Sequence, residues 1–260
     1  MPPRSVPILT YHQISERIPP SYRKYALTPG EFRRQIAWLA SAGYVSVPLA
    51  SLADGSWDRL PPRPVVITVD DGFQSAVAHA AQILGDHGFT ATFYAVAGEV
   101  GGQSSWTRRR RGGSWPLADA AALRALERAG HACGSHTLTH PALGHVTPAE
   151  VERELRESRH RLEDILGHEV RHLAYPFGSF NLVVQRLAAD AGYETACTIG
   201  PGHATRDADR LALPRLVVKG DQSFLDFVVQ VRTGHRMLEV RPSVALRHAA
   251  ASLLAAFLPF

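Results

Sequence analysis

The fold is decided by the stretch Val65-Val66-Ile67-Thr68-Val69-Asp70-Asp71-Gly72. Its first five residues are all β-branched, which predicts a strand that is buried on both faces, as in a parallel sheet. Two carboxylates and a glycine follow the strand directly, so we expect the chain to turn at this point. In parallel β-α folds the carboxyl ends of the strands carry the functional site. We therefore expect an α/β fold with Asp70 and Asp71 at its site.

Apolar runs alternate with helical patterns on both sides of this strand, which indicates repeated β-α units and a largely parallel sheet. Two helices begin at capping boxes, Thr28 with Glu31 and Thr147 with Glu150. About seven units predict a closed or nearly closed barrel, although periodicity alone fits an open sheet equally well. We expect strands near residues 6–9, 65–69, 91–96, 131–133, 171–175, 193–199 and 213–218, and helices near 28–43, 75–87, 117–129, 147–166, 181–191 and 222–233.

Residues 98–116 interrupt this alternation. They are rich in glycine, serine, arginine and tryptophan, and they predict a long loop. Long loops inside compact domains are often functional. The dense positive run Arg108–Arg111 lies in this segment, and we interpret it as part of a solvated loop.

The composition is that of an ordinary globular protein, with 45% hydrophobic and 20% charged residues. A length of 260 residues suits one domain, which we place at residues 1–240. The net charge of +4 comes without a nucleic-acid-binding motif or a long basic helix, so we expect no nucleic-acid partner. The two cysteines, Cys133 and Cys197, lie in apolar stretches and predict buried free thiols.

The two ends of the chain bear on its location. No signal-peptide pattern follows the first residues, and no stretch approaches the ~20 apolar residues that span a bilayer. We therefore expect a cytoplasmic protein. Residues 241–260 predict a short helix rich in alanine and leucine. This helix would either pack on the domain or lie at a membrane surface, which leaves peripheral membrane contact open.

A second polar motif follows the expected strand at residues 131–133. His136 and His140 are spaced i, i+4, which predicts that both imidazoles lie on one side of a helical turn. Two histidines at this spacing are a common way to hold Zn²⁺. Two unrelated surface histidines are the alternative in a chain with 13 histidines. Because this motif and the Asp70-Asp71 pair both begin where a strand ends, they could meet at one face.

One aspartate and two histidines form a three-ligand site that leaves positions open for water and substrate, as in catalytic metal sites. Zn²⁺ is the first choice, and Co²⁺, Ni²⁺, Mn²⁺ or Fe²⁺ could occupy the same ligands. Non-haem iron oxygenases use the same donor set. The second, adjacent aspartate offers a base and favours hydrolysis. Taken alone, the Asp70-Asp71 pair is equally consistent with a solvated turn.

Together, Thr-Val-Asp-Asp-Gly and the later Ser-His-Thr-Leu-Thr-His-Pro resemble the motifs of the polysaccharide deacetylase family, the NodB homology domain of carbohydrate esterase family 4. The resemblance spans roughly residues 6–220. It implies a distorted (β/α)7 barrel of the NodB type that hydrolyses the acetamide of N-acetylglucosamine-type residues at a divalent metal, usually zinc. It further implies that Asp71, His136 and His140 are the metal ligands and that Asp70 is the general base.

The chain departs from the commonest family pattern in its later motifs. Ala174 stands in the run 173–178 where the family usually has arginine. The usual aspartate of the fourth motif and the usual late histidine are also missing. These differences put the conventional general acid in doubt.

A subgroup of the family resembles this chain in those same places. Deacetylases of poly-β-1,6-N-acetylglucosamine combine an early Tyr-His pair, an Ala-Tyr-Pro-Phe-Gly-type run and a later Leu-Pro-Arg, all of which are present here. This resemblance implies that His12 is the general acid and that Arg215 pairs with Asp70. It also assigns the Phe177 backbone N–H to the oxyanion, with Tyr175 in the same run as a supporting residue.

The expected function is therefore metal-dependent N-deacetylation of an N-acetylated glycan. The missing motif residues motivate an alternative, a non-catalytic glycan-binding relative. The absent signal-peptide pattern and the C-terminal helix motivate another, a deacetylase of a lipid-linked or O-acetylated sugar. Fold resemblance does not decide among these substrates, because function lies in the details of the site.

Overall fold

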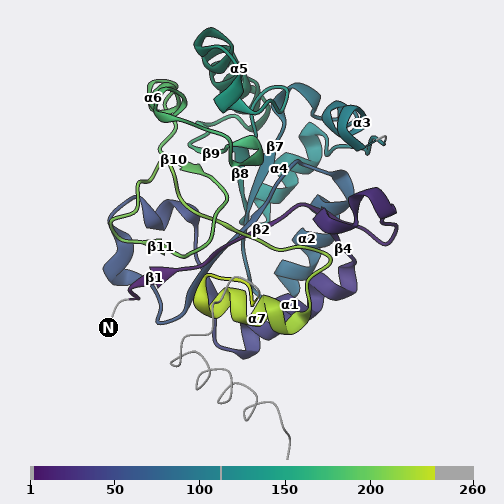
Figure 1. Cartoon of the computed structure of the whole chain (residues 1–260), viewed down its shortest axis with the longest axis vertical. Helices are drawn as coiled ribbons and strands as arrows, with labels where there is room; N and C mark the ends of the chain where they lie inside the picture. The colour runs from purple at the N-terminus through teal and green to yellow at the C-terminus, as the bar shows by residue number, and fades with distance from the viewer. Residues whose placement is uncertain (1–2, 112, 238–260) are drawn as a thin grey trace, which may run out of the picture.

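The computed structural model describes residues 3–111 and 113–237 (Figure 1). The helix predicted over residues 241–260 lies outside this range. Among the described residues, no helix combines the length and apolar character that crossing a bilayer requires.

A curled sheet of parallel strands forms the centre of the molecule. The predicted strand is β6 (Pro64–Val69), and all of its residues are buried. It pairs with β2 (Ile8–Tyr11) on one side and with β7 (Thr92–Ala95) on the other. The order along the sheet is β10-β9-β8-β7-β6-β2-β12, and β5 pairs with the start of β6. The remaining strands of this sheet are β5 (Val45–Ser46), β8 (Ala132–Ser135), β9 (His172–Ala174), β10 (Thr195–Cys197) and β12 (Leu216–Val217).

The two ends of the sheet come together at the chain that leads into β12. Leu213 forms a parallel bridge with Cys197 of β10, while β12 itself pairs with β2. The Gly200 backbone N–H donates to the Arg215 carbonyl (3.1 Å), which continues the contact. The fold is therefore the distorted α/β barrel of the NodB type that the resemblance implied.

Helices surround the curled sheet (Figure 1). Both predicted capping boxes are present, with reciprocal hydrogen bonds between Thr28 and Glu31 and between Thr147 and Glu150. In each box the threonine and glutamate satisfy backbone N–H groups that a helix start leaves unpaired. The helices that follow the predicted ranges are α1 (Pro29–Ser41), α2 (Gln74–Asp86), α4 (Ala120–Arg128), α5 (Pro148–Leu166), α6 (Leu182–Asp190) and α7 (Phe224–Thr233).

Shorter elements complete the described part of the chain. Two small ladders join β1 (Ser5–Val6) to β11 (Ala204–Thr205) and β3 (Gln13–Ile14) to β4 (Ala26–Leu27). The 3₁₀ turns are η1 (Pro20–Tyr25), η2 (Leu49–Leu52), η3 (Ser56–Arg59), η4 (Ala97–Glu99), η5 (Leu143–His145) and η6 (Pro176–Gly178). Both cysteines are buried and free, as predicted.

The prediction of an uninterrupted loop over residues 98–116 was wrong. A helix, α3 (Ser105–Arg111), lies within it. The carboxylate of Glu99 accepts hydrogen bonds from the backbone N–H (2.7 Å) and the hydroxyl of Ser105, where the helix begins. A carboxylate at a helix start satisfies unpaired N–H groups and complements the helix dipole. Because Glu99 lies six residues before Ser105, it does not form a capping box that local sequence patterns would reveal.

Close packing at Gly134 of β8 positions the strand that precedes His136. A Cβ at residue 134 would lie 2.6 Å from Cε1 of the buried Tyr94 ring and 2.9 Å from the carbonyl oxygen of His172. Neither atom has room to move, because the Tyr94 side chain is fully buried and the His172 carbonyl belongs to the neighbouring strand. The sheet therefore requires glycine at this position for steric reasons.

We expect Gly134→Ala to lower the free energy of unfolding by about 1–3 kcal/mol, as overpacked cores do. Gly30→Ala is the matched control, because a Cβ at residue 30 would meet no atom within 4 Å. That substitution should be neutral or stabilise the protein by about 0.4–1 kcal/mol. Urea unfolding of the two variants measures both effects, and equal midpoints would contradict the packing argument.

Candidate active site

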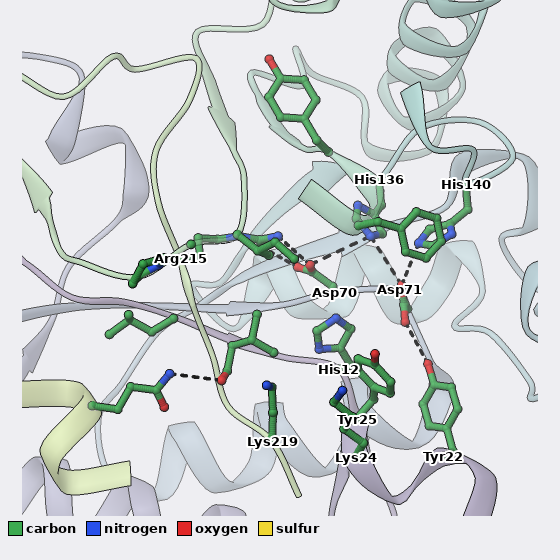
Figure 2. A pocket seen from close by; sticks show the side chains of 18 of the residues that line it. His12, Tyr22, Lys24, Tyr25, Asp70, Asp71, His136, His140, Arg215 and Lys219 are labelled. Atoms are coloured by element: carbon green, nitrogen blue, oxygen red, sulfur yellow. Dashed lines mark hydrogen bonds and ion pairs between the residues drawn. The ribbon is translucent and has the colours of Figure 1, made fainter. Parts of the chain in front are cut away.

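Asp71, His136 and His140 meet at the carboxyl ends of β6 and β8 (Figure 2). The Asp71 Oδ1 atom lies 3.5 Å from His136 Nε2 and 3.3 Å from His140 Nε2. All three side chains are buried, and their ligand atoms lie within 4.8 Å of one another. In the part of the chain that the structure describes, no other group of three His, Cys, Asp or Glu residues is compact enough to hold a metal ion.

The spacing of the two histidines predicted a helical turn, and this prediction was wrong. Residues 136–140 form an irregular turn in which Thr137 (φ 67°) and His140 (φ 63°) are left-handed. The Thr137 hydroxyl accepts from the His140 backbone N–H (3.1 Å), and the Ser135 hydroxyl accepts from the Thr137 N–H (3.1 Å). These side chains replace the backbone bonds that a helix would supply. Asp71 is also left-handed, with φ at 75°.

The imidazole of His136 is oriented by a second contact. Its Nδ1 atom lies 2.8 Å from the carbonyl oxygen of Ala174, so Nδ1 carries the proton that is donated to this oxygen. The lone pair of Nε2 is then directed at Asp71, which is the arrangement of a metal-binding histidine. Ala174 is the residue at the position where the family usually has arginine. The donor set and its spacing therefore fit a divalent metal ion.

The pKa values of the two histidines are shifted in opposite directions. Burial lowers the pKa of His140 to about 4, although the hydrogen bond to Asp71 opposes this, so the neutral, metal-binding form prevails. For His136 the effect of burial is outweighed by the carboxylates of Asp71 and Asp70, and its pKa is raised. The protonated form of His136 is therefore more populated than that of an ordinary histidine, and a metal ion bound there would compete with this proton.

A buried glutamate holds the histidine turn in place. Glu154 of α5 is only 2% exposed, and one of its oxygens accepts the backbone N–H groups of Leu138 and Thr139, each at 2.9 Å. Its other oxygen accepts the Thr139 hydroxyl at 2.6 Å. Glu154 was not among the residues that the sequence motifs indicated. One feature of the sequence could have revealed it: Glu154 is an acidic residue on the same buried face of α5 as Val151 and Leu155.

The second carboxylate, Asp70, lies beside the side chains of Asp71, His136 and His140 and is paired with Arg215. The guanidinium donates from Nη1 and Nη2 to the two oxygens of Asp70, each at 2.7 Å, and Arg215 is only 1% exposed. Burial alone would raise the pKa of Asp70, but Arg215 and the nearby His136 hold it below its usual range. The Asp70 side chain is therefore ionised at neutral pH.

A cavity of about 570 Å³ opens onto these residues. His12, which follows β2, lines this cavity, and its Nδ1 atom has no hydrogen-bond partner within residues 3–111 and 113–237. Burial lowers the pKa of His12, although the carboxylates of Asp71 and Asp70 act in the opposite direction. The cavity thus brings His12 to the same space as Asp70 and the three candidate metal ligands.

The run at 173–178 contributes two further residues to the cavity wall. The backbone of Phe177 is left-handed (φ 60°), and its ring contacts the His140 ring at a centroid distance of 4.7 Å. Tyr175 is fully buried, and its hydroxyl donates to the carbonyl of Leu211 (3.0 Å). The Tyr175 hydroxyl therefore donates its proton within the protein, while the Phe177 side chain faces the site.

Comparison with known proteins gives the family. The model of the family described as polysaccharide deacetylase matches residues 58–196, more than half of the chain. This chain belongs to the polysaccharide deacetylase family. A relative assigned to polysaccharide deacetylases, YxkH of Bacillus subtilis, is 26% identical over 223 residues, which cover 85% of this chain and 74% of that protein.

Two further comparisons concern a more distant relative and a solved structure. The poly-β-1,6-N-acetyl-D-glucosamine N-deacetylase of Escherichia coli is 23% identical over 86% of this chain, which spans only 38% of that protein. The solved structure of the Streptococcus pyogenes deacetylase PplD, in complex with acetate, superposes with a TM-score of 0.74. It is 23% identical and covers 89% of this chain and 99% of its own, so it supports the fold.

This member of the deacetylase family has two site contacts that sequence reasoning missed. The Tyr22 hydroxyl donates to Asp71 Oδ2 (3.3 Å) from the turn η1, and the Trp106 ring stacks on the His140 ring at 4.8 Å. Both contacts cross between segments that are distant in the chain. Trp106 is only 4% exposed, so its ring packs on the His140 ring inside the protein.

We expect Glu154→Gln to weaken divalent-metal binding by about 10–100-fold, because a neutral amide oxygen accepts the two backbone N–H groups more weakly than a carboxylate oxygen does and the histidine turn loosens. Glu157→Gln on the exposed face of the same helix is the matched control and should bind metal normally. Competition with a chelator measures both affinities. Equal affinities in the two variants would show that Glu154 does not position the turn.

Proposed function

We propose that this chain is a metal-dependent hydrolase that removes acetyl groups from the N-acetylated sugars of a glycan. The observation that carries the proposal is a compact Asp71, His136 and His140 cluster beside a second, arginine-paired carboxylate. Membership of the polysaccharide deacetylase family supports the reaction class. The E. coli relative named as a poly-β-1,6-N-acetyl-D-glucosamine N-deacetylase supports an N-acetylglucosamine polymer as substrate.

In this proposal Asp71, His136 and His140 hold the metal ion. Zn²⁺ suits one oxygen and two nitrogen ligands, and Co²⁺, Ni²⁺ or Mn²⁺ would suit them as well. A divalent ion in this position supplies Lewis-acid polarisation of a carbonyl and acidifies water. The protein contributes the orientation of the ligands, through the Ala174 carbonyl behind His136 and through Glu154 behind the turn.

Asp70 is the proposed general base. Arg215 keeps its carboxylate ionised and fixes its plane by two parallel hydrogen bonds. Each carboxylate oxygen has two lone pairs, so Asp70 can still accept a proton from an attacking water molecule. The neighbouring Asp71 stays a ligand because its oxygens are engaged by His136, His140 and Tyr22.

His12 is the proposed general acid. It would donate a proton to the departing sugar amine from the wall of the cavity opposite His136 and His140 (Figure 2). Burial lowers its pKa, which makes the imidazolium a stronger acid but a less populated one, and the carboxylates of Asp71 and Asp70 oppose this loss of the protonated form. The backbone N–H of Phe177 is the proposed donor to the oxygen that becomes negative, and the buried Tyr175 would support this turn.

We expect Asp70→Asn to reduce turnover by about 10²–10⁴-fold with the bound metal retained, because the base is lost while all three ligands remain. Asp71→Asn should instead lower the metal content. The measurement is acetate release from β-1,6- and β-1,4-linked N-acetylglucosamine oligomers, with metal stripped and then resupplied as Zn²⁺ or Co²⁺. Wild-type rates for Asp70→Asn would remove Asp70 as the base, and a protein that binds no metal would contradict the whole proposal.

We also expect His12→Ala to lower turnover by about 10²-fold or more at unchanged metal content, since the leaving amine then lacks its proton donor. His160→Ala, at an exposed position on α5, is the control for loss of an imidazole. A His12→Ala variant that is as active as this control would assign His12 a structural role only.

A further inference from the structure

The basic residues of this chain are very unevenly divided between the two types. Of 28 lysine and arginine residues, 26 are arginine, and the two lysines are Lys24 and Lys219. Both lysines line the cavity that opens onto the candidate metal ligands. Elsewhere in the described part of the chain the Lys/Arg charge is carried by arginine, whereas the exposed Lys24 and the half-buried Lys219 both border this cavity.

The two lysines come from separate segments that are packed directly against each other. Lys24 lies in the turn η1, and Lys219 follows β12. The Gly220 backbone N–H donates to the Lys24 carbonyl (3.2 Å). A Cβ at residue 220 would lie only 1.9 Å from the carbonyl oxygen of Ala26, so the approach requires glycine. The backbone thus holds the two lysine-bearing segments side by side.

The positive charges of these lysines are not neutralised by carboxylates, whereas those of two arginines that line the cavity are. Arg215 is paired with Asp70, and Arg236 is paired with Asp226 at 3.0 Å. Across residues 3–111 and 113–237, neither lysine ammonium has a carboxylate within 4.0 Å. Figure 2 shows both lysines on the His12 side of the cavity, across from His136 and His140. The Lys24 ammonium lies over the neutral Tyr25 ring, 5.8 Å from its centroid, which leaves its charge uncompensated. Two ammonium groups without a carboxylate partner on one wall attract an anion.

We propose that Lys24 and Lys219 bind an anionic substituent, a phosphate or a carboxylate, on the N-acetylated sugar that is deacetylated. This inference rests on the proposed function and deepens it, because it names the charge of the substrate. A lysine ammonium is a compact point charge on a flexible stem, whereas the arginine fork suits fixed planar partners. Lysine can therefore follow an anion that sits at a variable distance from the acetamido group.

The test measures binding first in metal-stripped protein, where a phosphate cannot be held by the metal ion. Ligand-observed NMR compares N-acetylglucosamine, its 1-phosphate, and N-acetylmuramic acid, which carries a carboxylate. We expect at least one of the anionic sugars to bind about tenfold tighter than the neutral sugar. This preference should disappear in the double variant Lys24→Gln, Lys219→Gln. It should persist in Arg23→Gln, which removes an exposed charge from the same turn outside the cavity.

The same comparison is then made for kcat/KM of acetate release with the metal restored, and circular dichroism verifies that the double variant is folded. Equal binding of all three sugars by the wild-type protein would overturn the inference, as would a preference that survives in a folded double variant. If neutral oligomers are nevertheless deacetylated, only the lysine site is lost. If no substrate releases acetate although metal is bound, the proposed function itself fails.

Discussion

The buried ion pair between Arg215 and Asp70 is the interaction on which the rest of the site depends. A guanidinium without solvent must be fully paired, since an isolated buried charge is very costly. Arg215 meets this requirement by joining three strand ends: Asp70 after β6, the Thr198 carbonyl after β10, and its own segment before β12. The contact that orients one carboxylate therefore also draws the two edges of the curled sheet together.

Sequence patterns predicted those parts of the fold that local chemistry determines. The β-branched run before Asp70 and the capping boxes at Thr28 and Thr147 act within a few residues, and the structure contains all three. The start of α3 depends on Glu99, and the shape of the histidine turn depends on Glu154, sixteen residues after Leu138. Neither contact has a periodicity that a single sequence would display, so the helix was missed and the turn was taken as helical.

The site residues also divide into those that local sequence motifs indicate and those that depend on contacts between distant segments. The four residues Asp70, Asp71, His136 and His140 were recognisable because each pair follows a strand directly, and parallel strands end at one edge. His12 and Arg215 came only from family resemblance, since the sequence does not indicate that residues 12 and 215 would share a cavity. Tyr22 and Trp106 had no comparable signal, although Tyr22 contacts Asp71 and Trp106 contacts His140.

The confinement of lysine to Lys24 and Lys219 has a practical consequence for chemistry on this protein. Primary amines are the targets of acylating and reductive-alkylating reagents, which in most proteins modify many lysines scattered over the surface. Here the side-chain amines are two, and both border one cavity. Apart from the N-terminal amine, a fluorophore or cross-linker carried by such a reagent would therefore be attached beside this cavity without any engineered cysteine.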